Sequence, residues 1–245
     1  MKFTIPQFTP GKYPTISTAI FVLTIVVAHV FATHGYEWTK NTISDLGAQG
    51  YDRKLIMQFG FLAFGLTLTA GVLYKGLTWR TIPILIYGLC VGLTGVFCTK
   101  PFFDLDHYSE IQSMIHSALA QLAGVSFTIG ILVQSFFTSH KREKWIHLTF
   151  FVLVIGLSAS FGLVNHYQGI VQRLLYLTSF IWLIGFYKPW QVVVTNNLDD
   201  QYRLPMVILG MEASMWSRSD WDKTTWYAHR FSCKRWIFLV SGMGV

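Results

Sequence analysis

The chain has 245 residues, of which 52% are hydrophobic and only 13% are Asp, Glu, Lys or Arg, whereas soluble domains carry about 25% charged residues. So few charged groups cannot cover the surface of a water-soluble globule, and the same composition excludes disordered, collagen-like and disulfide-framework proteins. The formal net charge of +7 also occurs in nucleic-acid-binding proteins, but the placement of the cations along the chain gives it another meaning.

Six continuous apolar stretches follow one another along the chain. A helix that crosses the roughly 30 Å hydrocarbon core of a bilayer needs about 20 such residues, because it rises about 1.5 Å per residue. The stretches do not alternate between apolar and polar residues, which argues against the strands of a membrane barrel. We therefore predict an all-α polytopic membrane protein, a six-transmembrane-helix bundle, with spans at residues 15–35, 55–74, 81–98, 113–138, 145–164 and 170–187.

The Lys and Arg residues predict how this bundle is oriented, because short cytoplasmic loops carry an excess of them. With a cytoplasmic N-terminus, 14 of the 19 Lys and Arg residues lie on the inner side, whereas the outer loops hold four of them together with six acids. We therefore expect a multi-pass protein of the cell (inner or plasma) membrane with both termini cytoplasmic. The positive charge is then a topology signal, so membrane lipids are the expected partners and nucleic acid is not.

Three parts follow from this topology: a cytoplasmic N-terminal segment (1–14), the membrane domain (15–187) and a cytoplasmic C-terminal tail (188–245). The tail has no long apolar run, yet it holds five of the nine tryptophans. Trp and basic residues together are typical of a segment that rests on the inner leaflet. An irregular soluble extension and a stretch that is not native to the fold remain open alternatives.

Titratable side chains gather on the predicted outer side. The loop before the fourth span carries Asp104, Asp106 and His107. Carboxylate and imidazole groups are the usual ligands of zinc and related divalent ions, so these residues could hold a metal together with His116 and His166. Their spacing matches no strong zinc motif, and a solvated acidic loop explains the three loop residues equally well.

The fourth span carries a polar stripe. Ser109 followed by Gln112 predicts the start of this helix by a capping box. Small and polar residues then recur at helical spacing along one face: Ser113, His116, Ser117, Ala120, Gln121 and Gly124. Such a stripe should face the bundle interior, because unsatisfied polar groups are costly in lipid. We expect His116 near the outer boundary, pointing inward, either as a functional group or as a hydrogen-bond partner of a neighbouring helix.

Two further elements lie at the same end of the predicted bundle. Residues 41–48 of the first outer loop are Asn-Thr-Ile-Ser-Asp-Leu-Gly-Ala, a composition typical of turns, and Asn41, Ser44 and Asp45 either build this turn or line a site. Arg173 lies about one turn into the last span, where a charge is costly unless it snorkels outward or pairs with an acid. Arg173 is therefore expected to join helices or to bind an anionic headgroup.

Three of these elements resemble the DUF998 family of unknown function, whose members are mostly prokaryotic membrane proteins of about six helices. They are the Ile-Ser-Asp-Leu-Gly-Ala sequence after the first span, the His116 helix after an acidic loop, and Gly169-x-x-x-Arg173 with Trp182 further along the last span. The resemblance covers roughly residues 15–187. It implies a shared helical bundle with outer polar residues and no established activity.

Two functions from different classes are compatible with this pattern. One is a non-catalytic or accessory protein that binds a lipid or lipid-linked ligand through Arg173, Asn41 and Gln121. The alternative is a membrane-embedded, metal-dependent hydrolase or transferase that acts on a lipid, a loose analogy with the alkaline ceramidase superfamily at the level of the fold. Its metal ligands or acid–base groups would come from Asp104, Asp106, His107, His116 and His166, with Ser44 and Asp45 assisting. A haem protein that uses His29, His116 or His166 is a third interpretation.

Overall fold

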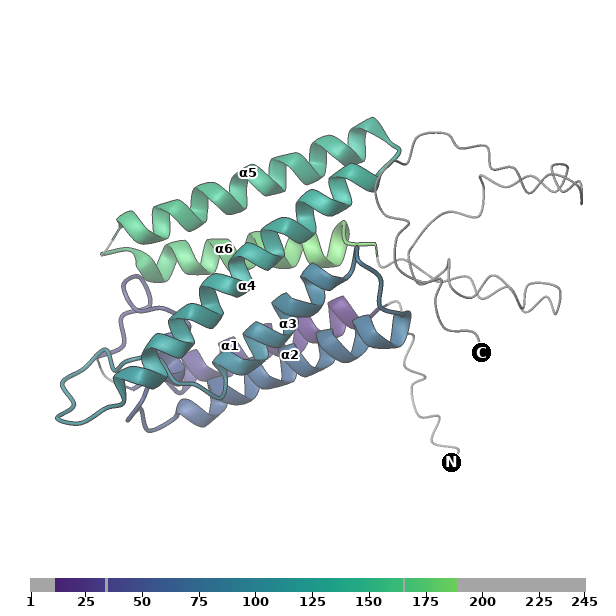
Figure 1. Ribbon diagram of the computed structural model, residues 1–245. Helices are drawn as coiled ribbons and strands as arrows, with labels where there is room; N and C mark the ends of the chain where they lie inside the picture. The colour runs from purple at the N-terminus through teal and green to yellow at the C-terminus, as the bar shows by residue number, and fades with distance from the viewer. Residues whose placement is uncertain (1–11, 34, 165, 189–245) are drawn as a thin grey trace, which may run out of the picture. The chain divides into compact units, whose positions relative to one another are not determined.

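The computed structural model describes residues 12–33, 35–164 and 166–188. This part of the chain contains six α-helices, one short 3-10 helix and no strands (Figure 1). The elements are α1 (Tyr13–Val30), η2 (Ser44–Gly47), α2 (Lys54–Lys75), α3 (Ile82–Thr94), α4 (Glu110–Phe137), α5 (Lys141–Leu163) and α6 (Gln168–Gly185). The all-α prediction is confirmed. The predicted tail beyond Lys188 and most of the predicted N-terminal segment lie outside the described residues.

The helix starts follow from their local sequences. α1 and α3 each carry a proline, Pro14 and Pro83, in the first turn, where the missing N–H and the fixed φ angle suit a helix start. α4 begins directly after Ser109, whose hydroxyl oxygen accepts a hydrogen bond from the Gln112 N–H at 3.3 Å. The capping residue predicted for this helix is therefore confirmed.

The helices form a closed ring. Each packs against the next in chain order, and α6 returns to contact α1. α5 is the least buried of the long apolar helices: 11% of its most apolar stretch is buried, against 39–44% for α1, α2 and α4. In Figure 1, α4 and α5 lie close together where α4 ends and α5 begins, and they diverge toward the N-terminal end of α4. This is the end of the bundle that carries the first loop.

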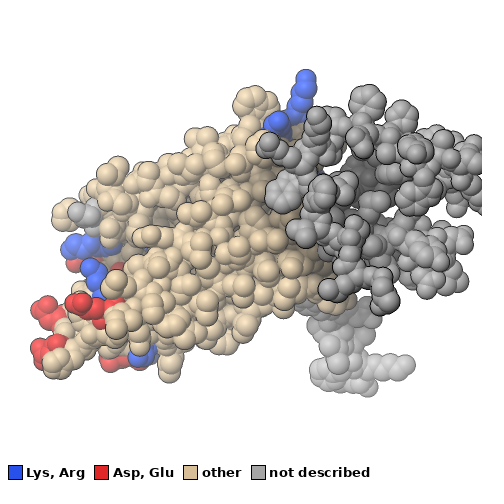
Figure 2. Space-filling model, in the orientation of Figure 1, with Lys and Arg blue, Asp and Glu red and all other residues tan. Residues whose placement is uncertain are grey.

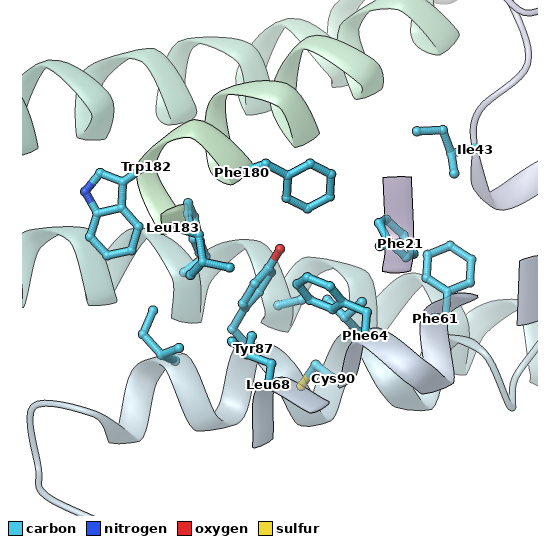
Figure 3. Packing of buried hydrophobic residues seen from close by; sticks show 14 of the residues in the cluster. Phe21, Ile43, Phe61, Phe64, Leu68, Tyr87, Cys90, Phe180, Trp182 and Leu183 are labelled. Carbon is cyan, nitrogen blue, oxygen red and sulfur yellow. The ribbon is translucent and has the colours of Figure 1, made fainter. Parts of the chain in front are cut away.

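Aromatic side chains and glycines hold the ring together. The Phe21 ring of α1 lies 5.2 Å from the rings of Phe61 and Phe64 on α2, measured between centroids, and 5.8 Å from the Phe180 ring of α6 (Figure 3). α2 and α3 approach closely where Gly65 lies against Gly92. This contact confirms the close helix packing expected of small residues in membrane helices.

Four helices, α1, α2, α4 and α5, are long and apolar enough to cross a membrane, so the six-span prediction holds only in part. The predicted span at 81–98 yields α3, a helix of 13 residues that rises only about 20 Å, less than the roughly 30 Å hydrocarbon core. α6 has 18 residues, but Gln168, Gln172 and Arg173 in its first two turns lower its hydropathy. On the face shown in Figure 2, charged residues lie at the ends of the described helices, with a broad uncharged region between.

Candidate functional site

The first loop (residues 35–53) is built around a reciprocal turn. The Asp45 carboxylate accepts a hydrogen bond from the Thr42 N–H at 2.7 Å, and the Thr42 hydroxyl oxygen accepts one from the Asp45 N–H at 3.2 Å. The two bonds have the reciprocal pattern of a capping box and close the turn that leads into η2. Burial raises the pKa of the Asp45 carboxyl above its usual range, although the hydrogen bonds from Thr42 act in the opposite direction. The two hydrogen bonds between Asp45 and Thr42 therefore stabilise the turn of the first loop.

Arg173 joins α6 to this loop through neutral acceptors. Its Nη1 donates to the carbonyl oxygens of Asn41 at 3.0 Å and Gly169 at 2.7 Å. Its Nη2 donates to the Tyr36 hydroxyl at 2.6 Å and lies 2.7 Å from Nε2 of His29. The guanidinium has five N–H groups, so four of them are engaged within the protein. The sequence suggested an acidic partner for Arg173, but its acceptors are carbonyl, hydroxyl and imidazole groups.

These contacts define the protonation state of His29. An arginine N–H is always a donor, so Nε2 of His29 has to accept the hydrogen bond from Arg173 with its lone pair. The Nδ1 of His29 lies 2.7 Å from the Ile25 carbonyl oxygen, which only accepts, so the proton is on Nδ1. His29 is therefore neutral, and both ring nitrogens are used to fix Arg173 to the last turn of α1.

The start of α6 docks directly on the first loop. The N–H groups of Gly169 and Ile170 donate to the carbonyl oxygens of Lys40 at 3.1 Å and Thr39 at 3.2 Å. Those N–H groups belong to the first turn, which has no partners within the helix. A Cβ atom on Gly169 would lie against the carbonyl oxygens of Trp38 and Asn41, so only glycine permits this approach. The first loop and the Gly169-x-x-x-Arg173 sequence form one structural unit, which we call the loop–α6 clasp.

Tyr36 and Gln172 complete the clasp. The Tyr36 hydroxyl accepts from Arg173 and donates to the Thr42 carbonyl oxygen at 2.9 Å. Burial raises its pKa to about 12, although Arg173 lowers it. The Gln172 side-chain oxygen accepts from the Ile43 N–H at 2.6 Å, and its amide nitrogen donates to the Ser44 hydroxyl at 3.5 Å. Each polar group here has a fixed structural partner.

Two further contacts join α4 to the same end of the bundle. The Gln49 side chain of the first loop accepts from the Ser109 N–H and donates to the Ser109 carbonyl oxygen, both at 2.8 Å. His116 is 5% exposed, and its Nδ1 lies 2.7 Å from the carbonyl oxygen of Phe97, just beyond α3. The inward-pointing orientation predicted for His116 is confirmed, and its observed contact joins neighbouring helices.

A pocket of about 70 Å³ lies between α3, α4 and α6, and Val154 of α5 also lines it. Small residues of α4, namely Ala120, Ala123 and Gly124, form one wall. Ser44 of the clasp lies at the pocket, beside Gln172 of α6. The pocket thus begins at the first loop and continues between the apolar helices, where Phe127 and Ser179 line it.

The other predicted site residues lie apart from this unit. Asp104, Asp106 and His107 are exposed in the connection between α3 and α4, and His166 is exposed between α5 and α6. Within the described residues, no three His, Cys, Asp or Glu side chains lie close enough to hold a metal ion. The structure therefore does not gather the five predicted zinc ligands (Asp104, Asp106, His107, His116 and His166) into one site.

The polar stripe of α4 departs from its prediction. His116 is buried, but Ser117 and Gln121 are exposed, because α4 diverges from α5 at this end. Gln121, predicted to bind a ligand, lies next to the pocket-lining Ala120 in the chain. The stripe is therefore packed against neighbouring helices only in part.

The sequence patterns predicted no role for Tyr36 or Gln172. A glutamine immediately before Arg173 in an apolar segment was a usable signal, since a polar group at that depth needs a partner. His29 was considered only as a haem ligand, and its spacing of four residues from Ile25 could have indicated a backbone contact. The pairing of these residues across 129 to 144 positions is not encoded in any local pattern.

The fold and this end of the bundle define a class: an all-helical membrane protein with an interlocked polar unit at one end. Residues 15–187 match the family described as "Protein of unknown function (DUF998)", and the chain belongs to this family. The family resemblance and its boundaries are confirmed. No curated protein and no solved structure matches the chain.

Proposed function

We propose that this protein is a six-span protein of the cell membrane, with both termini cytoplasmic. We further propose that it binds a lipid or lipid-linked ligand in the pocket between α3, α4 and α6 and acts without catalysing a reaction. The observation that carries the proposal is the pocket itself, which lies between apolar helices and begins at the first loop. α3 and α6 complete the six spans, with their flanking turns extending the short α3.

The packing of α4 supports access from the bilayer. α5 packs against both α4 and α6, yet α4 leaves α5 toward its own N-terminal end (Figure 1). Ala120 is exposed and Gly124 is half-buried on this side. A Cβ added to Gly124 would meet no atom within 4 Å, so there is open space at the pocket wall. An acyl chain can fill such space, because hydrocarbon tails are as apolar as the helix surface.

The polar residues outside the pocket support a non-catalytic role. Arg173, His29 and Asp45 hold the clasp together, and His116 bonds the end of α3. An acid–base catalyst needs a group within reach of a substrate proton, whereas these groups are directed at backbone and side-chain partners. Their observed contacts are those of a scaffold around the pocket.

Photolabelling tests the binding proposal. The protein is reconstituted in phosphatidylcholine vesicles that contain a phosphatidylcholine probe with a diazirine in its acyl chain, and labelled peptides are mapped after irradiation. We expect labels on α4 and α6 around Gly124, and their loss in Gly124→Leu, which fills the pocket. Gly156→Leu on α5 is the matched control, because a Cβ there also meets nothing within 4 Å. Equal labelling in both variants, or turnover of the probe during incubation, would contradict the proposal.

Cysteine accessibility tests the topology. Asp106→Cys should react with a membrane-impermeant maleimide in intact cells, whereas Lys144→Cys should react only after permeabilisation. These positions lie in the α3–α4 connection and in the first turn of α5. The reverse pattern would overturn the proposed orientation. Reaction of both cysteines in intact cells would show that α4, which lies between them, does not cross the membrane.

A further inference from the structure

Two tyrosine side chains of the pocket have free hydroxyls. Tyr87 of α3 is 5% exposed, and Tyr176 of α6 is half-buried; both line the pocket. Neither hydroxyl makes a hydrogen bond to any residue that the structure describes. By contrast, Tyr13 and Tyr187 bond each other at 3.1 Å, and Tyr51 accepts from a backbone N–H at 3.0 Å. Figure 3 shows the Tyr87 hydroxyl directed from α3 toward α6.

Unpaired hydroxyls in this pocket are available to a ligand. Polar groups in apolar surroundings are nearly always hydrogen-bonded when a partner can reach them, and both tyrosines line the pocket. Two other pocket hydroxyls already donate to backbone carbonyls, Thr94 to Val91 and Ser179 to Leu175, and the Ser44 hydroxyl accepts from Gln172. The two tyrosines therefore offer hydroxyls to which no described residue is bonded.

The lining restricts the chemistry of that molecule. The described residues that line the pocket include no Lys, Arg, His, Asp or Glu. A charged headgroup would be buried there without a counter-charge, which is strongly unfavourable. The pocket thus suits an uncharged polar group and disfavours a charged phospholipid headgroup.

The two tyrosines lie within the helices rather than at their ends. Tyr87 lies seven residues before Thr94, the last residue of α3, which places it about 10 Å from that helix end. Tyr176 lies two turns into α6, after the clasp residues Gln172 and Arg173. A lipid that binds both hydroxyls therefore has to bring its polar end into the pocket between α3, α4 and α6.

We propose that the pocket binds the uncharged polar end of a membrane lipid that has a free hydroxyl, such as a diacylglycerol, through hydrogen bonds from Tyr87 and Tyr176. This inference rests on the proposed function and specifies its ligand class. Each tyrosine donates to, or accepts from, the lipid hydroxyl and the neighbouring ester carbonyl. Selection against anionic lipids follows from the uncharged lining.

The test compares two photoactivatable probes with identical diazirine-bearing acyl chains, a diacylglycerol and a phosphatidylglycerol. Each is present at equal amounts in phosphatidylcholine vesicles that contain the full chain. We expect the diacylglycerol probe to label the pocket peptides of α3, α4 and α6 more strongly. Tyr87→Phe and Tyr176→Phe should each reduce this labelling about fivefold, as expected for one neutral hydrogen bond. The control Tyr74→Phe, at a residue 72% exposed, should leave it unchanged.

The outcomes separate this inference from the proposed function. Equal labelling by the two probes, or undiminished diacylglycerol labelling in the double Tyr→Phe variant, would overturn the ligand class while leaving lipid binding intact. Labelling by neither probe at the pocket would overturn the proposed function as well. Thermal unfolding of each variant in detergent shows that it is folded, since Tyr→Phe removes only a hydroxyl that has no partner among the described residues.

Discussion

Replacing Gly169 with Ala should open the loop–α6 clasp. The added Cβ would lie against the carbonyl oxygens of Trp38 and Asn41 and 2.9 Å from Nη1 of Arg173. Two of these neighbours are backbone atoms that cannot rotate away. α6 and the first loop would therefore have to separate, even though alanine is otherwise the best residue for a helix.

The magnitude follows from the contacts at this point. Separation weakens the two backbone hydrogen bonds from Gly169 and Ile170, each with a net contribution of about 1 kcal/mol. It also weakens the two bonds from Arg173 Nη1, which are stronger because the donor is charged, at about 1.5–3 kcal/mol each. If these bonds lose about half of their combined contribution of about 5–8 kcal/mol and the helix gains about 1 kcal/mol from alanine, the free energy of unfolding falls by about 2 kcal/mol.

Unfolding in mixed micelles with increasing SDS, followed by far-UV circular dichroism, measures this difference. Gly156→Ala is the matched control, because its added Cβ meets nothing within 4 Å and the variant should be as stable as the wild type or slightly more so. If Gly169→Ala unfolds at the same SDS fraction as Gly156→Ala, the close approach at Gly169 is not what holds α6 to the loop.

Three further predictions use the same unfolding measurement. Arg173→Lys should lose about 2 kcal/mol, because one ammonium group with three N–H donors cannot serve four acceptors; wild-type stability would refute the clasp geometry. Burial raises the pKa of Asp45 above its ordinary 3.8, so the protonated side chain stabilises the fold below that pH, and this stabilisation is lost as the pH rises through the folded-state pKa. Asp45→Asn should therefore make the free energy of unfolding less dependent on pH in this range. A difference between variant and wild type that is the same at every pH would contradict this prediction. His116→Ala should lower the free energy of unfolding by about 3 kcal/mol, whereas His166→Ala, at an exposed residue, should lower it by about 0.5 kcal/mol or less. Equal losses in the two variants would contradict a structural role specific to His116.

The helices were predictable from sequence because apolar continuity reports the membrane environment directly. Segments such as 55–74 agree closely with α2 (Lys54–Lys75). α3 was less predictable, because the apolar residues after Thr94 belong to turns that follow the helix. Apolar composition therefore indicates burial in membrane or protein, whereas helix length also depends on where the backbone turns.

The polar site was predictable in position but not in pairing. Sorting residues by membrane side placed Asp45, His116 and Arg173 at one end, where they lie in the structure. The sequence could not show that Arg173 bonds His29, because the partners are separated by 144 positions and neither carries a local motif for the other. The tyrosines of the pocket gave no sequence signal at all, since aromatic residues occur throughout the apolar helices and only their packing leaves a hydroxyl free.

The loop–α6 clasp also sets an order for biogenesis. His29 and Asn41 are synthesised 144 and 132 residues before Arg173, which at about 5–20 residues per second is a delay on the order of ten seconds. During that interval the first loop has its own internal turn but no guanidinium or helix start to bind. The contacts of Arg173 with the first loop and α1 can therefore form only after α6, the last helix, has been synthesised. A chain that ends before residue 168 would leave the Asn41 carbonyl, the Tyr36 hydroxyl and the His29 imidazole without their Arg173 partner.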